Sequence, residues 1–426
     1  MTILIFLAAL LAAIAMGVPI ALALLTSGIA LMVDQDFFNT QIAATNMING
    51  VDNFIFIAIP FFILAGELMN AGGLSRRIVN MSLALVGHVR GGLGYVVVLV
   101  SCLMASLSGS AIADSAAMAA LLLPMMRSAG YSVKRSVGLI AAGGIVAPII
   151  PPSIGLIMFG VIGNVSITKL FLAGIFPGLL LCVALAIVWW VLNRKQADTT
   201  LQPRASRREI MRAVGDGVWA LGLPVIIVGG LRLSIFTPTE SAVVAAFYAF
   251  FVGVFVYREL TPGKIYRALV SAAHTNGVVM FIVAAAFVSA WMITIADLPG
   301  ELEGLLGSVS DHPMVLMAFM MLLTILIGTA LDFTPMVLIL TPIMLPVARS
   351  AGIDPVYFGV LFILCVSIGL LTPPVGNVIN VVSSVSRRPF EEVATGVIPF
   401  LMAEIAVVIL LILFPELLLT PLSWWY

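Results

Sequence analysis

The chain has 426 residues, of which 62% are apolar and 9% are charged, and its 20 basic and 20 acidic residues leave no net charge. A soluble domain carries about 25% charged residues, so a surface built from this composition suits a lipid bilayer better than water. The balanced charge also argues against nucleic-acid binding, which needs a basic face. The composition therefore predicts an all-α polytopic membrane protein.

The apolar segments are long enough to cross a bilayer, which takes about 20 residues of helix. No Lys or Arg precedes Arg76, so the basic region of a cleavable signal peptide is missing and we expect a retained first helix. We predict nine full crossings, at 3–33, 54–71, 132–162, 168–193, 217–231, 237–257, 277–296, 355–384 and 395–422.

Two further stretches, 92–126 and 313–348, each contain two apolar runs separated by a polar, glycine-bearing tip. The tips fall at 106–110 and 328–333. Each run has fewer residues than the roughly 20 that a crossing helix needs. We therefore predict two re-entrant helical hairpins, whose tips require protein or a water-filled cavity to satisfy the backbone.

Two of the predicted crossings, 132–162 and 355–384, contain a proline pair at their centre, Pro151-Pro152 and Pro373-Pro374. Proline lacks an N–H and clashes with the preceding turn, so it breaks the helix and frees carbonyl groups. Freed carbonyls suit a hard cation, and the N-termini of half-helices attract carboxylates. One such pair alone would be read as a kink. Two pairs in register, each with a hairpin tip, predict two cation sites that flank one anion site.

An internal repeat supports that register. When the sequence is shifted by 222 positions, residues 124–177 align with 346–399 without gaps, and both Arg-Ser-Ala-Gly and Pro-Pro recur at identical spacing. We predict a first repeat over 1–193, a cytoplasmic loop and linking helix over 194–236, and a second repeat over 237–426. The linking helix inverts the second repeat, an arrangement typical of secondary transporters.

The distribution of positive charge predicts the orientation. If the N-terminus is cytoplasmic, 17 of the 20 Lys and Arg residues fall in cytoplasmic segments, which is the bias expected of membrane proteins. The opposite loops carry acidic residues, among them Asp34, Asp36, Asp297 and Glu301.

Asp332 is the ionisable residue that we most expect to be functional, because it lies at a hairpin tip inside the membrane. It also suits the N-cap of the following helix, and the two roles are compatible. Asp114 is either functional or a partner of a helix dipole. For Glu67, Glu240 and Glu404 we expect hydrogen bonds between helices.

No motif for ATP hydrolysis, nucleophilic catalysis or zinc-dependent catalysis occurs in the chain. The histidines form no cluster. We therefore expect no enzyme activity and no cofactor, and transport that an ion gradient drives.

Several motifs resemble the large membrane subunit of TRAP (tripartite ATP-independent periplasmic) transporters. They are ASLSGSA at 105–111, PIIPPS at 148–153, FTPTE at 236–240 and LTPPVGN at 371–377. The resemblance covers essentially the whole chain. It implies a sodium-driven elevator carrier in the bacterial inner membrane. It also implies two partners, a small four-helix membrane subunit and a periplasmic solute-binding protein.

The resemblance also implies site residues. One sodium site would involve Ser106, Gly109, Ala147 and Ile150, and the other Gly328, Gly369, Thr372 and Val375. The solute would meet Ser108, Ser153 and Asp332. The family carries organic acids, including C4-dicarboxylates, sialic acids and other sugar acids, and the pattern here looks closer to the sugar-acid branch. A stand-alone ion-coupled carboxylate transporter and, less favoured, an ion channel remain as alternatives.

Overall fold

The computed structural model describes residues 2–194, 204–306 and 312–423. Within those residues every regular element is a helix, and seven helices are long and apolar enough to cross a membrane. This confirms the predicted all-α membrane fold. Part of the predicted cytoplasmic loop, residues 195–203, lies outside the described residues.

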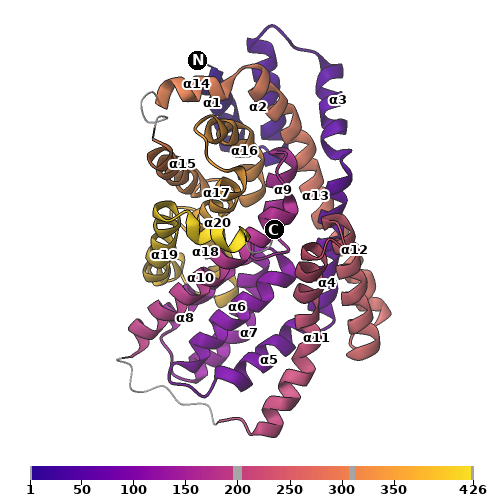
Figure 1. The fold of residues 1–426 in the computed structure, drawn as a ribbon, viewed down its shortest axis with the longest axis vertical. Helices are drawn as coiled ribbons and strands as arrows, with labels where there is room; N and C mark the ends of the chain where they lie inside the picture. The colour runs from indigo at the N-terminus through magenta and orange to yellow at the C-terminus, as the bar shows by residue number, and fades with distance from the viewer. Residues whose placement is uncertain (1, 195–203, 307–311, 424–426) are drawn as a thin grey trace.

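The first part of the chain forms α1 to α11, which are labelled in Figure 1, and a short 3₁₀ turn, η1. They are α1 (Thr2–Ala15), α2 (Ile20–Asp34), α3 (Thr40–Val51), η1 (Phe54–Ile57), α4 (Ala58–Ala71), α5 (Leu74–Val86), α6 (Gly92–Ser108), α7 (Ala111–Ser128), α8 (Val133–Gly144), α9 (Ile154–Ile162), α10 (Ile167–Asn193) and α11 (Arg207–Arg232).

The second part continues with α12 (Pro238–Phe251), a π-helical turn η2 (Val252–Val256), α13 (Pro262–Ile295), α14 (Leu298–Leu306), α15 (Pro313–Gly328), α16 (Phe333–Ser350), α17 (Pro355–Gly369), α18 (Asn377–Ser386), α19 (Phe390–Leu413) and α20 (Glu416–Ser423).

The helices follow the repeat that the sequence predicts. At the offset of 222 positions, α7 and α16 coincide residue for residue, and α8, α9 and α10 correspond to α17, α18 and α19. Both proline pairs contain a cis peptide bond, Pro151-Pro152 and Pro373-Pro374. The two hairpins, α6–α7 and α15–α16, and the two broken helices, α8–α9 and α17–α18, are thereby confirmed. The repeat boundaries at 193 and 237 stay a prediction.

The repeats pack through each other. The hairpin arm α7 contacts its own broken helix at α8 and the other repeat's at α18, while α16 contacts α17 and α9. Each hairpin is therefore held by both repeats. The arms have 16 to 18 residues, slightly longer than the predicted apolar runs, because each helix continues past the end of its run.

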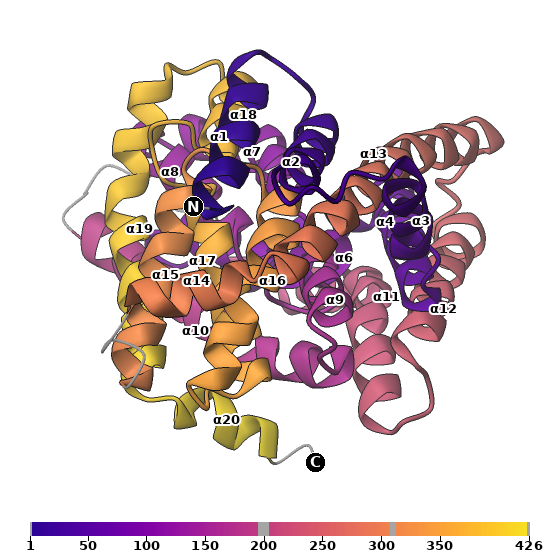
Figure 2. The same cartoon turned by 90° about the horizontal axis from the view of Figure 1, so that it is seen from above.

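A second group of helices packs beside the hairpins. Helix α13 packs on α2 and α4, α12 packs on α4, and α11 packs on α5 and α12. In the view from above, α3, α4, α11 and α12 gather at one side and α15, α17 and α19 at the other (Figure 2). This second group borders the hairpins through α4 and α13, which is where the candidate site lies.

The predicted first crossing at 3–33 is wrong. Gly17, at φ +78°, and Pro19, before the first turn of α2, divide it into α1 and α2, which pack against each other. The Thr2 hydroxyl donates to Glu301 Oε1 at 2.9 Å. Thr2 and Glu301 therefore lie at the same end of the helices, whereas the predicted orientation placed them on opposite sides of the membrane.

Other helices differ from the prediction at their ends. The predicted crossings at 217–231 and 277–296 begin earlier, at Arg207 and Pro262, and the crossing at 395–422 is divided into α19 and α20. Helices α3 and α14 were not predicted. Helix α3 starts where Asn39 Oδ1 accepts the N–H groups of Gln41 and Ile42. This cap stabilises a helix within the segment 34–53, which the prediction left as a loop.

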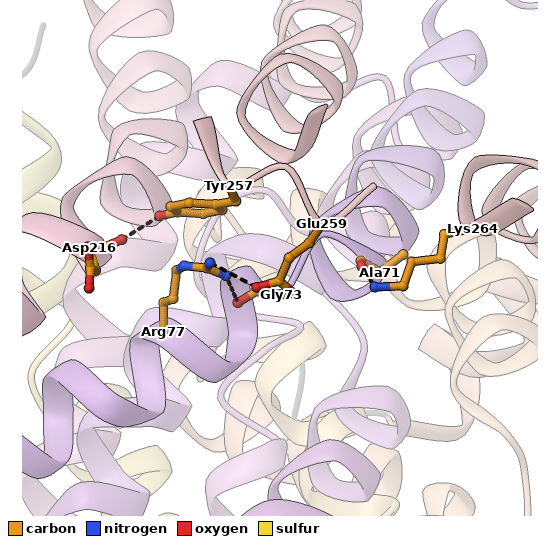
Figure 3. A network of polar contacts seen from close by, with 7 residues as sticks. All are labelled: Ala71, Gly73, Arg77, Asp216, Tyr257, Glu259 and Lys264. Carbon is orange, nitrogen blue, oxygen red and sulfur yellow. Dashed lines mark hydrogen bonds and ion pairs between the residues drawn. The ribbon is translucent and has the colours of Figure 1, made fainter. Parts of the chain in front are cut away.

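A polar network fixes the turn between α4 and α5 (Figure 3). The Arg77 guanidinium pairs with Glu259 at 2.8 Å, donates to the Gly73 carbonyl at 3.0 Å, and lies 3.7 Å from the centre of the Tyr257 ring. Burial raises the pKa of Tyr257 to about 12, so its hydroxyl stays protonated and donates to the Asp216 carbonyl at 2.5 Å. The network therefore ties the start of α5 to α11 and to the segment between η2 and α13.

Candidate functional site

A cavity of about 260 Å³ lies where the two hairpin tips and the two helix breaks meet. The first tip contributes residues 108–113, the second contributes 332–334, and the breaks contribute Pro148, Ile154 and Leu370. The sequence predicted this convergence of two tips and two breaks, and the structure brings all four together around one space.

The first tip is closed by its own side chains and by the first break. Gly109 lies at φ +60°, and a Cβ there would come within 2.7 Å of the Pro152 carbonyl oxygen, so only glycine allows this approach. The Ser110 hydroxyl caps α7 by accepting the Ala113 N–H. The tip therefore rests directly on the break.

Ser108 lines the cavity and links it to Asp114. Its hydroxyl donates to Asp114 Oδ1 at 2.5 Å and accepts the Ser110 N–H at 3.1 Å. Asp114 is only 2% exposed, and its second carboxylate oxygen has no hydrogen-bond partner. A carboxylate thus lies buried directly behind the first tip.

Asp332 holds the second tip. Its Oδ1 accepts the Phe333 N–H at 2.9 Å, which caps α16, and it also accepts Asn377 Nδ2 at 3.2 Å. Asn377 is the first residue of α18. The capping role that the sequence indicated is therefore present, and the same carboxylate also joins the tip to the second break while lining the cavity.

Ser153, the third residue predicted to meet the solute, is fully buried and does not line the cavity. Its hydroxyl donates to the Pro148 carbonyl and accepts the Leu156 N–H. Ser153 caps α9, and its neighbour Ile154 faces the cavity in its place.

The polar character of the cavity comes from helix ends rather than from basic side chains. The first turns of α7, α9 and α16 reach it through Ala111, Ile154 and Phe333. No Lys or Arg lines it among the described residues, whereas Glu67 and Asp332 do. A helix N-terminus carries partial positive charge and unpaired N–H groups, so three of them together favour an anion.

The residues predicted for sodium fall around the tips and breaks. Gly328 and Gly369 meet backbone to backbone: a Cβ on Gly328 would lie 2.9 Å from the Gly369 Cα. The Thr372 hydroxyl donates to the Ile368 carbonyl at 2.8 Å, which leaves its oxygen lone pairs available, and the Val375 carbonyl accepts Asn380 Nδ2 at 2.8 Å.

In the first repeat, Gly109 approaches Pro152 and Ser153. The Ser106 hydroxyl donates to the Leu103 carbonyl at 2.7 Å, and Ala147 and Ile150 lie in the segment between α8 and α9. Both sodium sites stay predictions.

The sequence did not predict the wall that α4 and α13 supply through Ile63, Asn70, Thr275 and Val279. Glu67 also belongs to this wall, and it accepts the Ser271 hydroxyl at 2.9 Å, which confirms the expected hydrogen bond between helices. Glu67 could be singled out in the sequence because it is an acidic residue in an apolar segment. The other four wall residues have no comparable feature in the sequence.

The same expectation is wrong for Glu240 and Glu404. Glu240 forms a capping box with Thr237 inside α12. Both carboxylate oxygens of Glu404 are buried without a hydrogen-bond partner.

Comparison with known proteins gives a consistent set of relatives. The family described as the DctM component of tripartite ATP-independent periplasmic transporters matches residues 7–417. The chain is 52% identical over 424 residues to the 2,3-diketo-L-gulonate TRAP transporter large permease protein YiaN of Escherichia coli, which covers 100% of both chains. It is 40% identical over 400 residues to the sialic acid TRAP transporter large permease protein SiaM of Vibrio cholerae, covering 94% of this chain and 93% of SiaM.

Among solved structures, the YdaH transporter of Alcanivorax borkumensis matches with a TM-score of 0.63 and covers 90% of each chain. At 15% sequence identity, this similarity concerns the fold alone.

Proposed function

Because the chain belongs to the DctM component family of TRAP transporters, we propose that it is the large permease subunit of a sodium-coupled TRAP transporter that imports an organic acid anion. One observation carries the proposal. Three helix N-termini line one cavity between two hairpin tips and two helix breaks. That arrangement suits a carboxylate without a basic side chain.

Sodium as the coupling ion rests on the charge of the cavity. Glu67 and Asp332 line it and no basic residue offsets them among the described residues. An anionic solute beside carboxylates is repelled unless cations lie nearby. The carbonyls freed at the two breaks and the Thr372 hydroxyl supply oxygen ligands of the kind that a hard cation prefers.

An elevator movement is the mechanism that we propose. The hairpins and broken helices form the moving part, and α2, α4, α11, α12 and α13 form the scaffold. The position of the cavity supports this division, because α4 and α13 wall it on one side and the tips and breaks on the other. Sliding at that boundary would carry the solute across the inner membrane.

Two partners complete the proposed transporter, a small four-helix membrane subunit and a periplasmic solute-binding protein. A separate small subunit is supported by the relatives named large permease, which this chain covers over 93% or more of their length. The isethionate TRAP transporter permease protein DctMQ of Oleidesulfovibrio alaskensis is longer, and the chain covers 62% of it.

A sugar acid is the solute class that we propose. The similarity to the permease named for 2,3-diketo-L-gulonate, at 52% identity over the full length, supports it.

The test reconstitutes this chain with its proposed small subunit in vesicles and adds the proposed binding protein. We expect uptake of 2,3-diketo-L-gulonate to exceed that of sialic acid and succinate and to require the binding protein. Full uptake without the binding protein would support a stand-alone carrier, and ion currents without solute coupling would support a channel.

A further inference from the structure

A second cavity, of about 230 Å³, lies at the end of α10 and beside the first turn of α6. Its lining consists of Val89, Arg90, Tyr95, Trp190, Asn193 and Arg194. These residues fall in segments that the positive-inside rule places on the cytoplasmic side. The cavity is separate from the candidate transport site and shares no residue with it.

The lining is positively charged. Arg90 and Arg194 contribute two guanidinium groups, and no acidic residue is present among the lining residues. A neighbouring cavity between α5 and α11 provides a contrast. There Arg77 and Arg212 are balanced by Glu209 and Asp216. Of these two cavities, the one at the end of α10 has a net charge that favours an anion.

The arginines keep donors for a ligand. Arg90 Nη2 donates to the Arg194 carbonyl at 3.1 Å, which occupies one of the five N–H donors of a guanidinium. Arg135 Nη1 donates to the Leu192 carbonyl at 2.8 Å. These two bonds satisfy carbonyls at the C-terminus of α10, whose partial negative charge would otherwise oppose an anion.

Asn193, which lines the cavity, carries an unpaired polar atom. Its side chain is 5% exposed, and its Oδ1 has no hydrogen-bond partner. A buried amide oxygen without a partner is unfavourable, so a ligand hydroxyl that donates to it would be stabilised. The Tyr95 hydroxyl lies in the same lining and can donate to a phosphate oxygen.

An apolar face leads to the cavity along α10. Leu179, Val183, Ile187 and Trp190 are each about half exposed and follow one another at helical spacing. Such a face suits acyl chains, and tryptophan is enriched at the level of lipid headgroups. Continuity between this face and the cavity favours a phospholipid over a free phosphate.

We propose that the cavity at the end of α10 binds one anionic phospholipid with a hydroxyl-bearing headgroup, of the phosphatidylglycerol type. Arg90, Arg194 and Tyr95 hold the phosphate, Asn193 accepts a headgroup hydroxyl, and an acyl chain lies along α10. The lipid would brace the α5–α6 connection against α10, at the base of the first hairpin.

Native mass spectrometry of the purified chain tests this, after equilibration with equal amounts of phosphatidylglycerol and phosphatidylethanolamine. The wild type should retain phosphatidylglycerol preferentially. Arg90→Gln with Arg194→Gln should lower that retention by about tenfold, since each basic residue near the membrane surface adds to the attraction of anionic lipid. Retention of phosphatidylethanolamine should not change. Arg212, in the charge-balanced cavity between α5 and α11, provides the control. Arg212→Gln should not change the retention of phosphatidylglycerol.

The Gln double variant also loses the hydrogen bond from Arg90 to the Arg194 carbonyl at the end of α10. Two milder changes therefore separate an effect on binding from an effect on folding. Arg90→Lys with Arg194→Lys keeps both charges and should restore most retention, whereas Tyr95→Phe should lower it without changing the thermal midpoint. Equal retention by wild type and the Gln variant would overturn the proposal. Full displacement of the lipid by soluble glycerol phosphate would also overturn it, because the ligand would then be a free phosphate.

Discussion

Gly328 and Gly369 touch backbone to backbone, at the point where the second hairpin tip rests on the second helix break. A Cβ on Gly369 would lie 2.6 Å from the Gly328 Cα, and neither backbone can yield as a flexible side chain would. We expect Gly369→Ala to force the tip from the break and to abolish transport, measured as solute uptake at matched membrane levels.

Gly229→Ala is the control for that change. Gly229 lies in α11, and a Cβ there would meet nothing within 4 Å. Since alanine favours a helix by about 1 kcal/mol over glycine, this variant should transport normally and be at least as stable. Normal uptake by Gly369→Ala would show that the close contact is not needed for function.

Asp332→Asn separates charge from capping. Asparagine caps a helix about as well as aspartate, and its amide oxygen can still accept the Phe333 N–H and Asn377 Nδ2. We expect normal folding and loss of uptake, because only the charge is removed. Asp332→Ala should also lose about 1 kcal/mol of stability, the usual effect of deleting a cap. Uptake by the Asn variant at the wild-type level would leave Asp332 with a capping role alone.

Thr372→Val tests the hydroxyl at the second break. The change keeps the shape of the side chain and removes the oxygen that we assign to a sodium site. The apparent sodium affinity of uptake should weaken by about tenfold, the scale of one hydrogen-bonding or ion-binding group. Thr395→Val is matched, because the Thr395 hydroxyl makes the same kind of bond, to the Glu391 carbonyl at 2.7 Å, at an exposed position on α19. Equal sodium affinity in the two variants would assign Thr372 to packing.

Arg77→Lys tests the network at the turn between α4 and α5. Lysine keeps the charge but loses the planar group that pairs with Glu259 and stacks on Tyr257. We expect a loss of about 1 kcal/mol in stability, from a partly exposed ion pair and a cation–π contact, seen as a lower thermal midpoint. Arg388→Lys, whose pair with Glu392 is 3.7 Å long, should change the midpoint less. The reverse order would contradict the assigned role of Arg77.

The proline pairs and polar tips could be predicted from sequence because their effect is local. A proline removes a backbone N–H wherever it lies, so the breaks and hairpins followed directly. The division at 17–19 left a similar signal in Gly17 and Pro19, but the surrounding apolar run was long enough to be read as one crossing. Hydropathy averages over a turn that contains few polar residues.

The far wall of the candidate site could not be predicted. Thr275 and Val279 line the cavity only because α13 packs on α4, and no local pattern encodes that contact. Ser153 shows the opposite case. The family resemblance implied a role with the solute, but its hydroxyl is used by the Pro148 carbonyl and the Leu156 N–H.

Sodium-driven uptake into vesicles tests the central claim most directly. The complete transporter, with its binding protein outside, should accumulate the labelled sugar acid when sodium is high outside and low inside, and ATP should make no difference. Dissipating the sodium gradient should abolish accumulation, because coupled sodium entry is then no longer available to drive the solute uphill. Equal accumulation when potassium replaces sodium would contradict the account.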